Sequence, residues 1–261
     1  MEFAYILAGL VVGLVVGLTG IGGGALMTPI LIVGFGIPPV TAVSTDLLYA
    51  AVTKSGGIVA YARNKMIEFR VVGLLLCGSI PGCLVTLSYL HELEGLDKIE
   101  HLMNLTLGVS LVLTSFAVFF RQRIRDRALA WQQDPKAQRL GQWRPYITAI
   151  MGFALGGMVT LSSVGAGALG TALLIVLYPK LSMQQIVGTD LLHAVVLTAI
   201  AGAGHYDMGN VDLTLLAYLL VGSLPGVFLG GHLGVRLSPK IMQPIMGSLL
   251  LAIGLRFMIA G

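Results

Sequence analysis

Two aspartates lie a few residues inside long apolar segments, each in the sequence Thr-Asp-Leu-Leu: Asp46 follows Thr45, and Asp190 follows Thr189. An unpaired carboxylate in such a segment is costly, so ionisable residues there default to a functional role. We predict that Asp46 and Asp190 support coupling by binding a proton or a sodium ion. The alternative that the threonines or the aspartates cap a helix stays open, and it does not exclude a role at the site.

Lys54 and His193 are the other candidates for ion coupling. Lys54 is the one basic residue deep in a predicted span, where it could pair with Asp46 or attract an anion. It could instead extend toward the end of its helix near Arg63. His193 lies one helical turn from Asp190 and could relay protons, although a histidine with no visible partner is more often structural.

Two glycine-rich breaks interrupt apolar segments at equivalent places, one at 22–24 and one at 165–167. About 16 helical residues precede each break and cover about 24 Å, which places both near the bilayer midplane. Irregular backbone is tolerated there only in a cavity, and helices that begin after the breaks direct free N–H groups into it. Two such N-termini form an anion site. The alternative is that these glycines only permit tight helix packing.

Hydroxyl groups beside the breaks add donors for an anion. The predicted substrate-binding residues are Thr19, Gly22, Gly23, Gly24, Thr45, Ser162, Ser163, Gly165, Ala166, Gly167 and Thr189. Valine at Gly23 or Ala166 is expected to weaken anion binding by filling the space that the ligand needs. Valine at Gly9 is expected not to do so.

The elements that hold these residues must be membrane helices. Of the 261 residues, 56% are hydrophobic and 11% are charged, far from the roughly 25% charged residues of a soluble domain. We therefore expect a multi-pass protein of the cytoplasmic (inner) membrane, with the lipid bilayer as its main partner, no soluble catalytic domain and no enzymatic activity. The net charge of +4 comes largely from 121–144, which topology explains better than nucleic-acid binding does. No cofactor and no metal site are predicted.

The chain repeats itself with an offset of about 144 residues, which indicates an internal duplication. Thr28 matches Thr171, the two Thr-Asp-Leu-Leu sequences match, and Gly78-Ser79-Ile80-Pro81-Gly82 matches 222–226. Each half is predicted to hold one glycine-interrupted segment followed by three spans. The predicted segments are 3–36, 40–62, 70–90 and 101–120, then 146–177, 183–204, 213–234 and 241–260.

The fold class is therefore all-α: a polytopic membrane helix bundle of two repeats, each with a glycine-broken or re-entrant first helix. Its predicted parts are a first repeat at 1–120, a basic cytoplasmic linker at 121–145 and a second repeat at 146–261. The linker's arginines place it in the cytoplasm, and the acidic residues Glu92, Glu94, Asp97 and Glu100 form a loop on the other side. Inverted repeats fit this charge rule better than parallel repeats with eight full spans, which stay open as the alternative.

These residues together resemble the TauE/SafE family of sulfite exporters, also called the toluene sulfonate uptake permease family. The resemblance rests on GLTGIGGGALMTPIL at 17–31, SSVGAGALGTALL at 162–174, VGTDLL at 187–192, and the GSIPG and GSLPG boxes that begin at 78 and 222. It implies secondary transport of a small anion, a sulfur-containing oxyanion or organosulfonate such as sulfite, sulfoacetate or thiosulfate, driven by an ion gradient.

Two other function classes compete with an anion transporter. A passive anion channel could be lined by the same helix termini. An aspartyl intramembrane protease would need the two carboxyl groups adjacent, sharing a proton. The sequences STDLL and GTDLL lack the Gly-x-Gly-Asp signature expected of such proteases, which makes this the weakest of the three.

Overall fold

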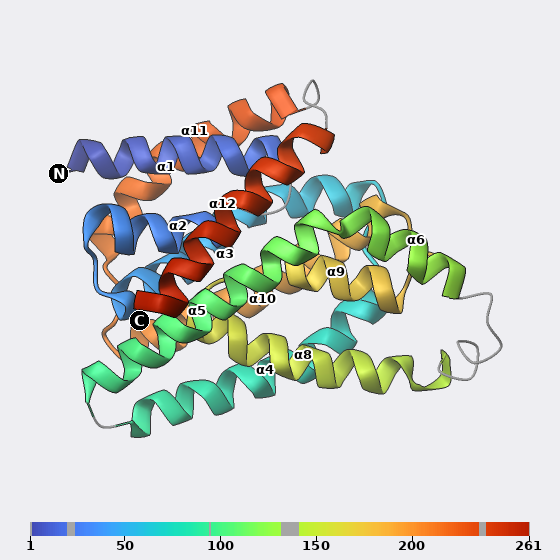
Figure 1. Ribbon diagram of the computed structural model, residues 1–261, viewed down its shortest axis with the longest axis horizontal. Coiled ribbons are helices and arrows are strands. Elements are labelled where there is room, and N and C mark those ends of the chain that lie inside the picture. The colour runs from blue at the N-terminus through green and yellow to red at the C-terminus, as the bar shows by residue number, and fades with distance from the viewer. Residues whose placement is uncertain (1, 20–23, 94, 132–140, 235–238, 261) are drawn as a thin grey trace.

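The computed structural model describes residues 2–19, 24–93, 95–131, 141–234 and 239–260, and these contain helices and no strand. The helices of the first half are α1 (Glu2–Thr19), α2 (Gly24–Pro29), the π-helical η1 (Ile30–Gly34), α3 (Pro39–Arg63), α4 (Phe69–Glu92) and α5 (Leu96–Phe119). Those that follow are α6 (Arg121–Trp131), the 3₁₀ turn η2 (Gly141–Trp143), α8 (Arg144–Ser162), α9 (Ala168–Leu177), α10 (Met183–Asp207), α11 (Leu213–Gly234) and α12 (Pro239–Ala260). Figure 1 shows them as one elongated bundle.

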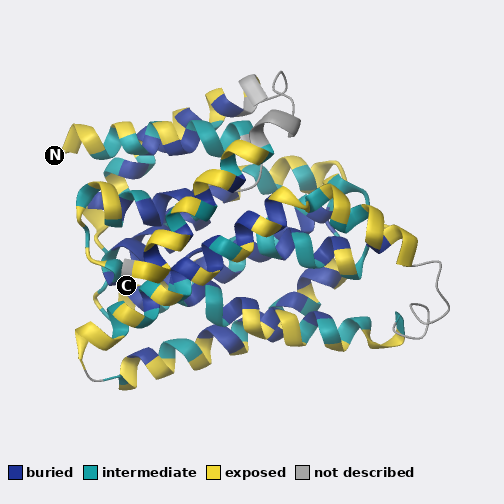
Figure 2. Ribbon diagram, in the orientation of Figure 1, coloured by how far each residue is buried: buried dark blue, intermediate teal, exposed yellow. Residues whose placement is uncertain are grey.

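Five stretches are long and apolar enough to cross a membrane: α4, α5, Gly141–Ser162, α10 and Leu213–Gly230. This confirms an all-helical, multi-pass membrane protein. The exposed positions face outward along the helices and the buried ones gather between them (Figure 2). One boundary was wrong, because α5 begins at Leu96 and so includes Asp97 and Glu100, which the sequence had assigned to a loop. An acidic residue in the first turn of a helix interacts favourably with its dipole.

The two halves match element by element. α3 and α10 lie 144 residues apart at both ends (183 minus 39 and 207 minus 63), and each is 25 residues long. α8 ends at Ser162 and α9 begins at Ala168, so the helix is interrupted where the sequence predicted a break. In the first half α1 ends at Thr19 and α2 begins at Gly24, and the predicted break between them lies outside the described residues.

In each half, the first helix packs against a helix of the other half. Helix α1 of the first half packs along α11 of the second, and α8 of the second half packs along α4 of the first (Figure 1). Gly9 and Gly13 of α1 face Leu219 and Ser223 of α11, so residue numbers rise together and the two helices are parallel. The α4–α8 pair is parallel in the same way, because Gly152 and Gly156 face Leu75 and Ser79.

The helices that pair with their own repeat equivalents run in opposite directions. Gly57 of α3 faces Leu191 of α10 while Gly202 faces Leu48, which makes α3 and α10 antiparallel. α5 and α12 are also antiparallel, because the Ser115 hydroxyl donates to the Gly247 carbonyl at 2.7 Å while Gly108 faces Gly254 further back along α5.

Glycine makes the parallel contacts possible. A Cβ atom added to Gly78 of α4 would overlap the Ala149 carbonyl oxygen of α8, and one added to Gly222 would overlap that of Ile6. The Gly-Ser-x-Pro-Gly boxes are therefore packing positions. Gly9 also packs closely, against the Leu219 carbonyl, so valine there would disturb the contact between α1 and α11.

This packing predicts that alanine substitutions at two glycines of α4 differ greatly in their effect on stability. We expect Gly78→Ala to destabilise the protein by about 1–3 kcal/mol, because the added methyl group must displace α8 backbone. Gly73→Ala is the matched control, since its Cβ would meet nothing within 4 Å. Thermal unfolding of both variants in detergent measures the difference. Equal melting temperatures would contradict this account of the α4–α8 contact.

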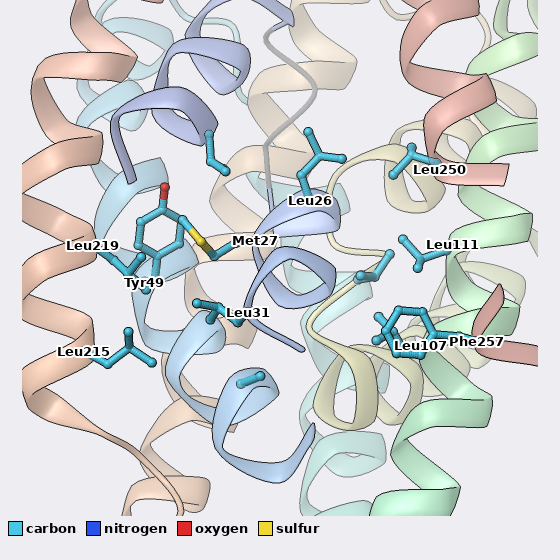
Figure 3. Packing of buried hydrophobic residues seen from close by; sticks show 13 residues of the cluster. Leu26, Met27, Leu31, Tyr49, Leu107, Leu111, Leu215, Leu219, Leu250 and Phe257 are labelled. Atoms are coloured by element: carbon cyan, nitrogen blue, oxygen red, sulfur yellow. The ribbon is translucent and has the colours of Figure 1, made fainter. Parts of the chain in front are cut away.

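The short helix after the first break is embedded in the bundle. Leu26, Met27 and Leu31, from α2 and η1, are 3% exposed or less. Figure 3 shows them between Leu215 and Leu219 of α11 on one side and Leu107, Leu111, Leu250 and Phe257 of α5 and α12 on the other. Apolar packing on both sides fixes α2 in the interior and thereby positions Thr28, whose side chain is fully buried.

Candidate functional site

Each buried aspartate accepts a hydrogen bond from a threonine of the short helix in its own half. The Thr28 hydroxyl donates to Oδ2 of Asp46 at 2.5 Å, and the Thr171 hydroxyl donates to Oδ2 of Asp190 at 2.9 Å. The second oxygen, Oδ1, of each aspartate is buried and has no hydrogen-bond partner among the described residues. These threonines were not predicted as site residues, although their matching repeat positions could have identified them.

The second glycine-rich break has a backbone that few residue types adopt. Ser163 has φ 55°, and Gly165 and Gly167 have φ 120° and 139°. Only glycine takes such angles without strain, which explains the two glycines around Ala166. The chain thus leaves α8 and enters α9 through a short irregular segment, and residues 163–166 are buried.

Lys54 reaches this break from the other half of the protein. Its Nζ donates to the Ala166 carbonyl oxygen at 2.8 Å, and the side chain is 6% exposed. It does not extend toward the helix end near Arg63, so that alternative was wrong. It has no ion pair with Asp46, but it interacts electrostatically with both Asp190 and Asp46. The structure therefore brings together the two aspartates, the lysine and the second break.

The two serine hydroxyls at the second break differ in whether they are already hydrogen-bonded within the protein. Ser162 donates to the Met158 carbonyl at 2.6 Å and accepts from the Val164 N–H at 3.2 Å, so it closes the end of α8. Ser163 lies next to Asp46, and its Oγ is buried without a hydrogen-bond partner of good geometry within the described ranges. Of the predicted hydroxyls, Ser163 is the one left with donor capacity at the break.

Part of the predicted site lies where the structure describes little. Gly22, Gly23 and the Thr19 side chain lie outside the part of the chain that the structure describes. Gly24 is the first residue of α2. The prediction for the first break therefore stays a prediction.

Thr45 and Thr189 join the two halves. Thr189 Oγ1 accepts from the Glu68 N–H at 3.0 Å, and Thr45 Oγ1 accepts from the Asp212 N–H at 3.1 Å. Each threonine thus binds the backbone just before a long helix of the opposite half. The suggestion that they cap their own helices was wrong, because both lie inside α3 and α10, and Ser182 caps α10.

His193 has a partner that the sequence did not reveal. Its Nε2 lies 3.0 Å from the Ser79 hydroxyl, and the ring is fully buried. Ser79 belongs to the Gly-Ser-x-Pro-Gly box of α4, so this contact also crosses between the halves. Tyr49 occupies the equivalent position in the first half (193 minus 144), which restricts any proton relay by His193 to one half.

A second positively charged side chain, Arg121, lines a small cavity near Asp190. The cavity measures about 20 Å³ and is lined by Ala117, Val118, Arg121, Ala168, Thr171, Ala172 and Val187. This is room for about one water molecule. Arg121 Nε is buried and, within the described part of the chain, has no hydrogen-bond partner. Burial lowers the pKa of the Arg121 guanidinium, and the nearby Asp190 carboxylate opposes that shift.

A larger groove separates α3 from α11. Its volume is about 1030 Å³, and it is lined by Val52, Thr53, Ser55, Gly56, Gly57, Ala60, Leu224, Val227, Phe228 and His232. The α10 residues at the positions of Gly56 and Gly57 are Ile200 and Ala201 (offset 144), which are bulkier. The two halves therefore differ in shape at this point, although their backbones correspond.

Comparison with known proteins identifies the chain's relatives. The family model described as "Sulfite exporter TauE/SafE" matches residues 5–257. The chain is 40% identical over 260 residues to "Probable membrane transporter protein YjnA" of Bacillus subtilis (strain 168), covering 98% of this chain and 99% of that protein. It is 28% identical over 241 residues to "Probable membrane transporter protein YdhB" of the same organism, covering 91% of each. No solved structure gives a significant match. The chain belongs to the TauE/SafE sulfite exporter family, whose members are named as membrane transporters.

Proposed function

We propose that this protein is a secondary transporter of a small sulfur-containing oxyanion or organosulfonate across the cytoplasmic membrane, with the anion bound between the two glycine-rich breaks. The observation that carries the proposal is the contact of Lys54 Nζ with the Ala166 carbonyl at 2.8 Å. It places a buried cation, held by one half of the protein, at the break in the other half. An anion bound there would contact both halves at once.

The chemistry of the second break suits an oxyanion. Backbone N–H groups at the start of α9 have no partner within the helix, and the helix dipole adds positive potential there. Ser163 supplies a hydroxyl, and Lys54 supplies charge. Fixed donors of this kind favour a compact head group such as sulfite or a sulfonate.

Asp46 and Asp190 give the site its coupling chemistry in this proposal. Two buried carboxylates beside one lysine leave an excess of negative charge, which opposes entry of an anion. A proton or sodium ion on either aspartate removes that excess. Anion and cation would then bind together, so a cation gradient could drive the anion.

We further propose that the halves are inverted repeats, with 121–145 as a basic cytoplasmic linker between them. The antiparallel pairs α3–α10 and α5–α12 support this, because repeats related by an axis in the membrane plane place equivalent helices in opposite directions. The groove between α3 and α11 would serve as an access path on one side. Accessibility labelling that maps both termini to the cytoplasm would exclude the inverted arrangement.

Purified protein in liposomes tests the transport function against the channel alternative. We expect sulfite, thiosulfate or sulfoacetate trapped inside to accelerate uptake of its labelled form by exchange, without large currents. Large ohmic anion currents would establish a channel instead. A solute screen by thermal shift selects the compound to use, because a ligand that binds the folded state raises its melting temperature.

Ala166→Val tests the location of the anion. The residue is buried between two glycines that need positive φ, so a larger side chain fills space next to the Lys54 amine. We expect at least a tenfold loss of affinity for the anion found in the screen, in line with an overpacking cost of about 1–3 kcal/mol. Gly73→Val is the control, because its surroundings are open. Wild-type affinity in folded Ala166→Val would remove the anion from this break.

A further inference from the structure

Within the described ranges, three arginines of the basic helix α6 have no ion-pair partner. Arg121, Arg123, Arg125 and Arg127 alternate along its first two turns, and Asp126 is the one acidic residue of the helix. Within the described part of the chain, no carboxylate forms an ion pair with Arg123, Arg125 or Arg127. Like charges four residues apart on a helix repel each other, so Arg123 and Arg127 destabilise α6 unless an anion lies beside them.

One face of α6 is fixed to the bundle. Ile124 packs against the buried cluster of Val71, Leu75, Leu174, Ile175 and Ile186, and Ala128 is buried as well. Arg123 and Arg127 are exposed on a different face. The helix is thus held in place by apolar contacts while Arg123 and Arg127 face away from the protein.

Aromatic side chains mark this end of the bundle as a membrane interface. Phe119, Phe120, Trp131, Trp143 and Tyr146 are all exposed, and Figure 1 shows α6 and the start of α8 at the same end. The Arg123 guanidinium lies 5.7 Å from the Phe120 ring centroid, and the ring centroids of Trp143 and Tyr146 lie 5.8 Å apart. Aromatic residues gather at the level of lipid head groups, which puts the arginines there too.

We propose that α6 is a docking surface for anionic phospholipid head groups, with Arg123 and Arg127 as the main contacts. The phosphate of a lipid supplies the missing negative charge, and its acyl chains extend along the exposed apolar surface of α5. Arginine suits this partner because its planar fork binds phosphate through two hydrogen bonds. A clustered basic segment directly after a membrane span is typical of such recognition.

Native mass spectrometry of the full-length protein in detergent, titrated with phosphatidylglycerol or phosphatidylcholine, tests this surface. We expect phosphatidylglycerol to bind more tightly, and Arg123→Gln/Arg127→Gln to lose about fivefold in affinity for each arginine removed. The control Arg63→Gln/Lys65→Gln removes the same charge from two exposed positions, the last residue of α3 and the turn after it, and is expected to bind phosphatidylglycerol like the wild type.

Three results would overturn the proposal. Equal binding of the two lipids would show that the head-group charge is not recognised. An equal loss in the control variant would reduce the effect to general surface charge. Displacement of the bound lipid by millimolar inorganic phosphate would identify a site for the free ion. Unchanged melting temperatures of both variants exclude misfolding as the cause of a loss.

Discussion

Lys54→Met is expected to reduce anion affinity by about 10- to 100-fold, because it removes a charged hydrogen-bond donor worth about 1.5–3 kcal/mol from the break. Methionine has nearly the same length, so the packing of α3 is kept. The change also removes the positive charge beside two buried carboxyl groups, which lowers stability, so affinity is compared on protein shown to be folded by its melting transition. Uptake of the selected anion into liposomes and its binding to purified protein measure the change.

Thr198→Val is the matched control for this variant, because Thr198 occupies the equivalent position in the second half (198 minus 144 is 54). Its hydroxyl donates to the Ala194 carbonyl of its own helix at 2.8 Å. We expect less than a threefold change in affinity. A Lys54→Met protein that binds the anion like the wild type would refute the proposed role of the lysine.

Asp46→Asn and Asp190→Asn are expected to uncouple transport from the ion gradient. Asparagine keeps the size of the side chain and still offers an oxygen to Thr28 or Thr171. It removes the carboxylate that we propose binds the coupling ion. Exchange of labelled for unlabelled anion should persist, while uptake driven by a proton or sodium gradient should fall at least tenfold in one of the two variants or in both.

The exposed Asp207, at the end of α10, provides the control for these changes, since Asp207→Asn removes the same charge outside the buried site. Asp207→Asn is expected to show the same gradient-driven uptake as the wild type. If both site variants retain the full pH and sodium dependence of the wild type, these carboxyl groups do not carry the coupling ion.

Much of the helical organisation followed from sequence because lipid imposes a simple pattern on it. Apolar length alone predicted α4, α5, α10 and α11 to within a few residues. The Thr-Asp-Leu-Leu pair identified two buried carboxyl groups, which are at most 2% exposed. Repetition at a constant offset predicted equivalent elements, since a duplicated sequence folds into duplicated structure.

What the sequence could not provide is the contact between distant residues. Lys54 meets Ala166, and His193 meets Ser79, more than 110 residues apart in each case. Nothing local in the spacing of these residues marks them as partners, because the exchange of helices between halves decides which faces meet. The contacts of Thr45 and Thr189 could not be predicted for the same reason: their partners, Asp212 and Glu68, belong to the opposite half.

That exchange also sets the order in which the protein can be completed during synthesis. Helix α1 ends at Thr19, whereas its partner α11 begins at Leu213. At about 5–20 residues per second, α1 leaves the ribosome roughly 10 to 40 s before α11 exists. During that time the glycines of α1 contact lipid or an assisting protein instead of α11. Helix α4 is likewise made before its partner α8. The first half is therefore inserted as an open form whose final contacts arrive only with the second.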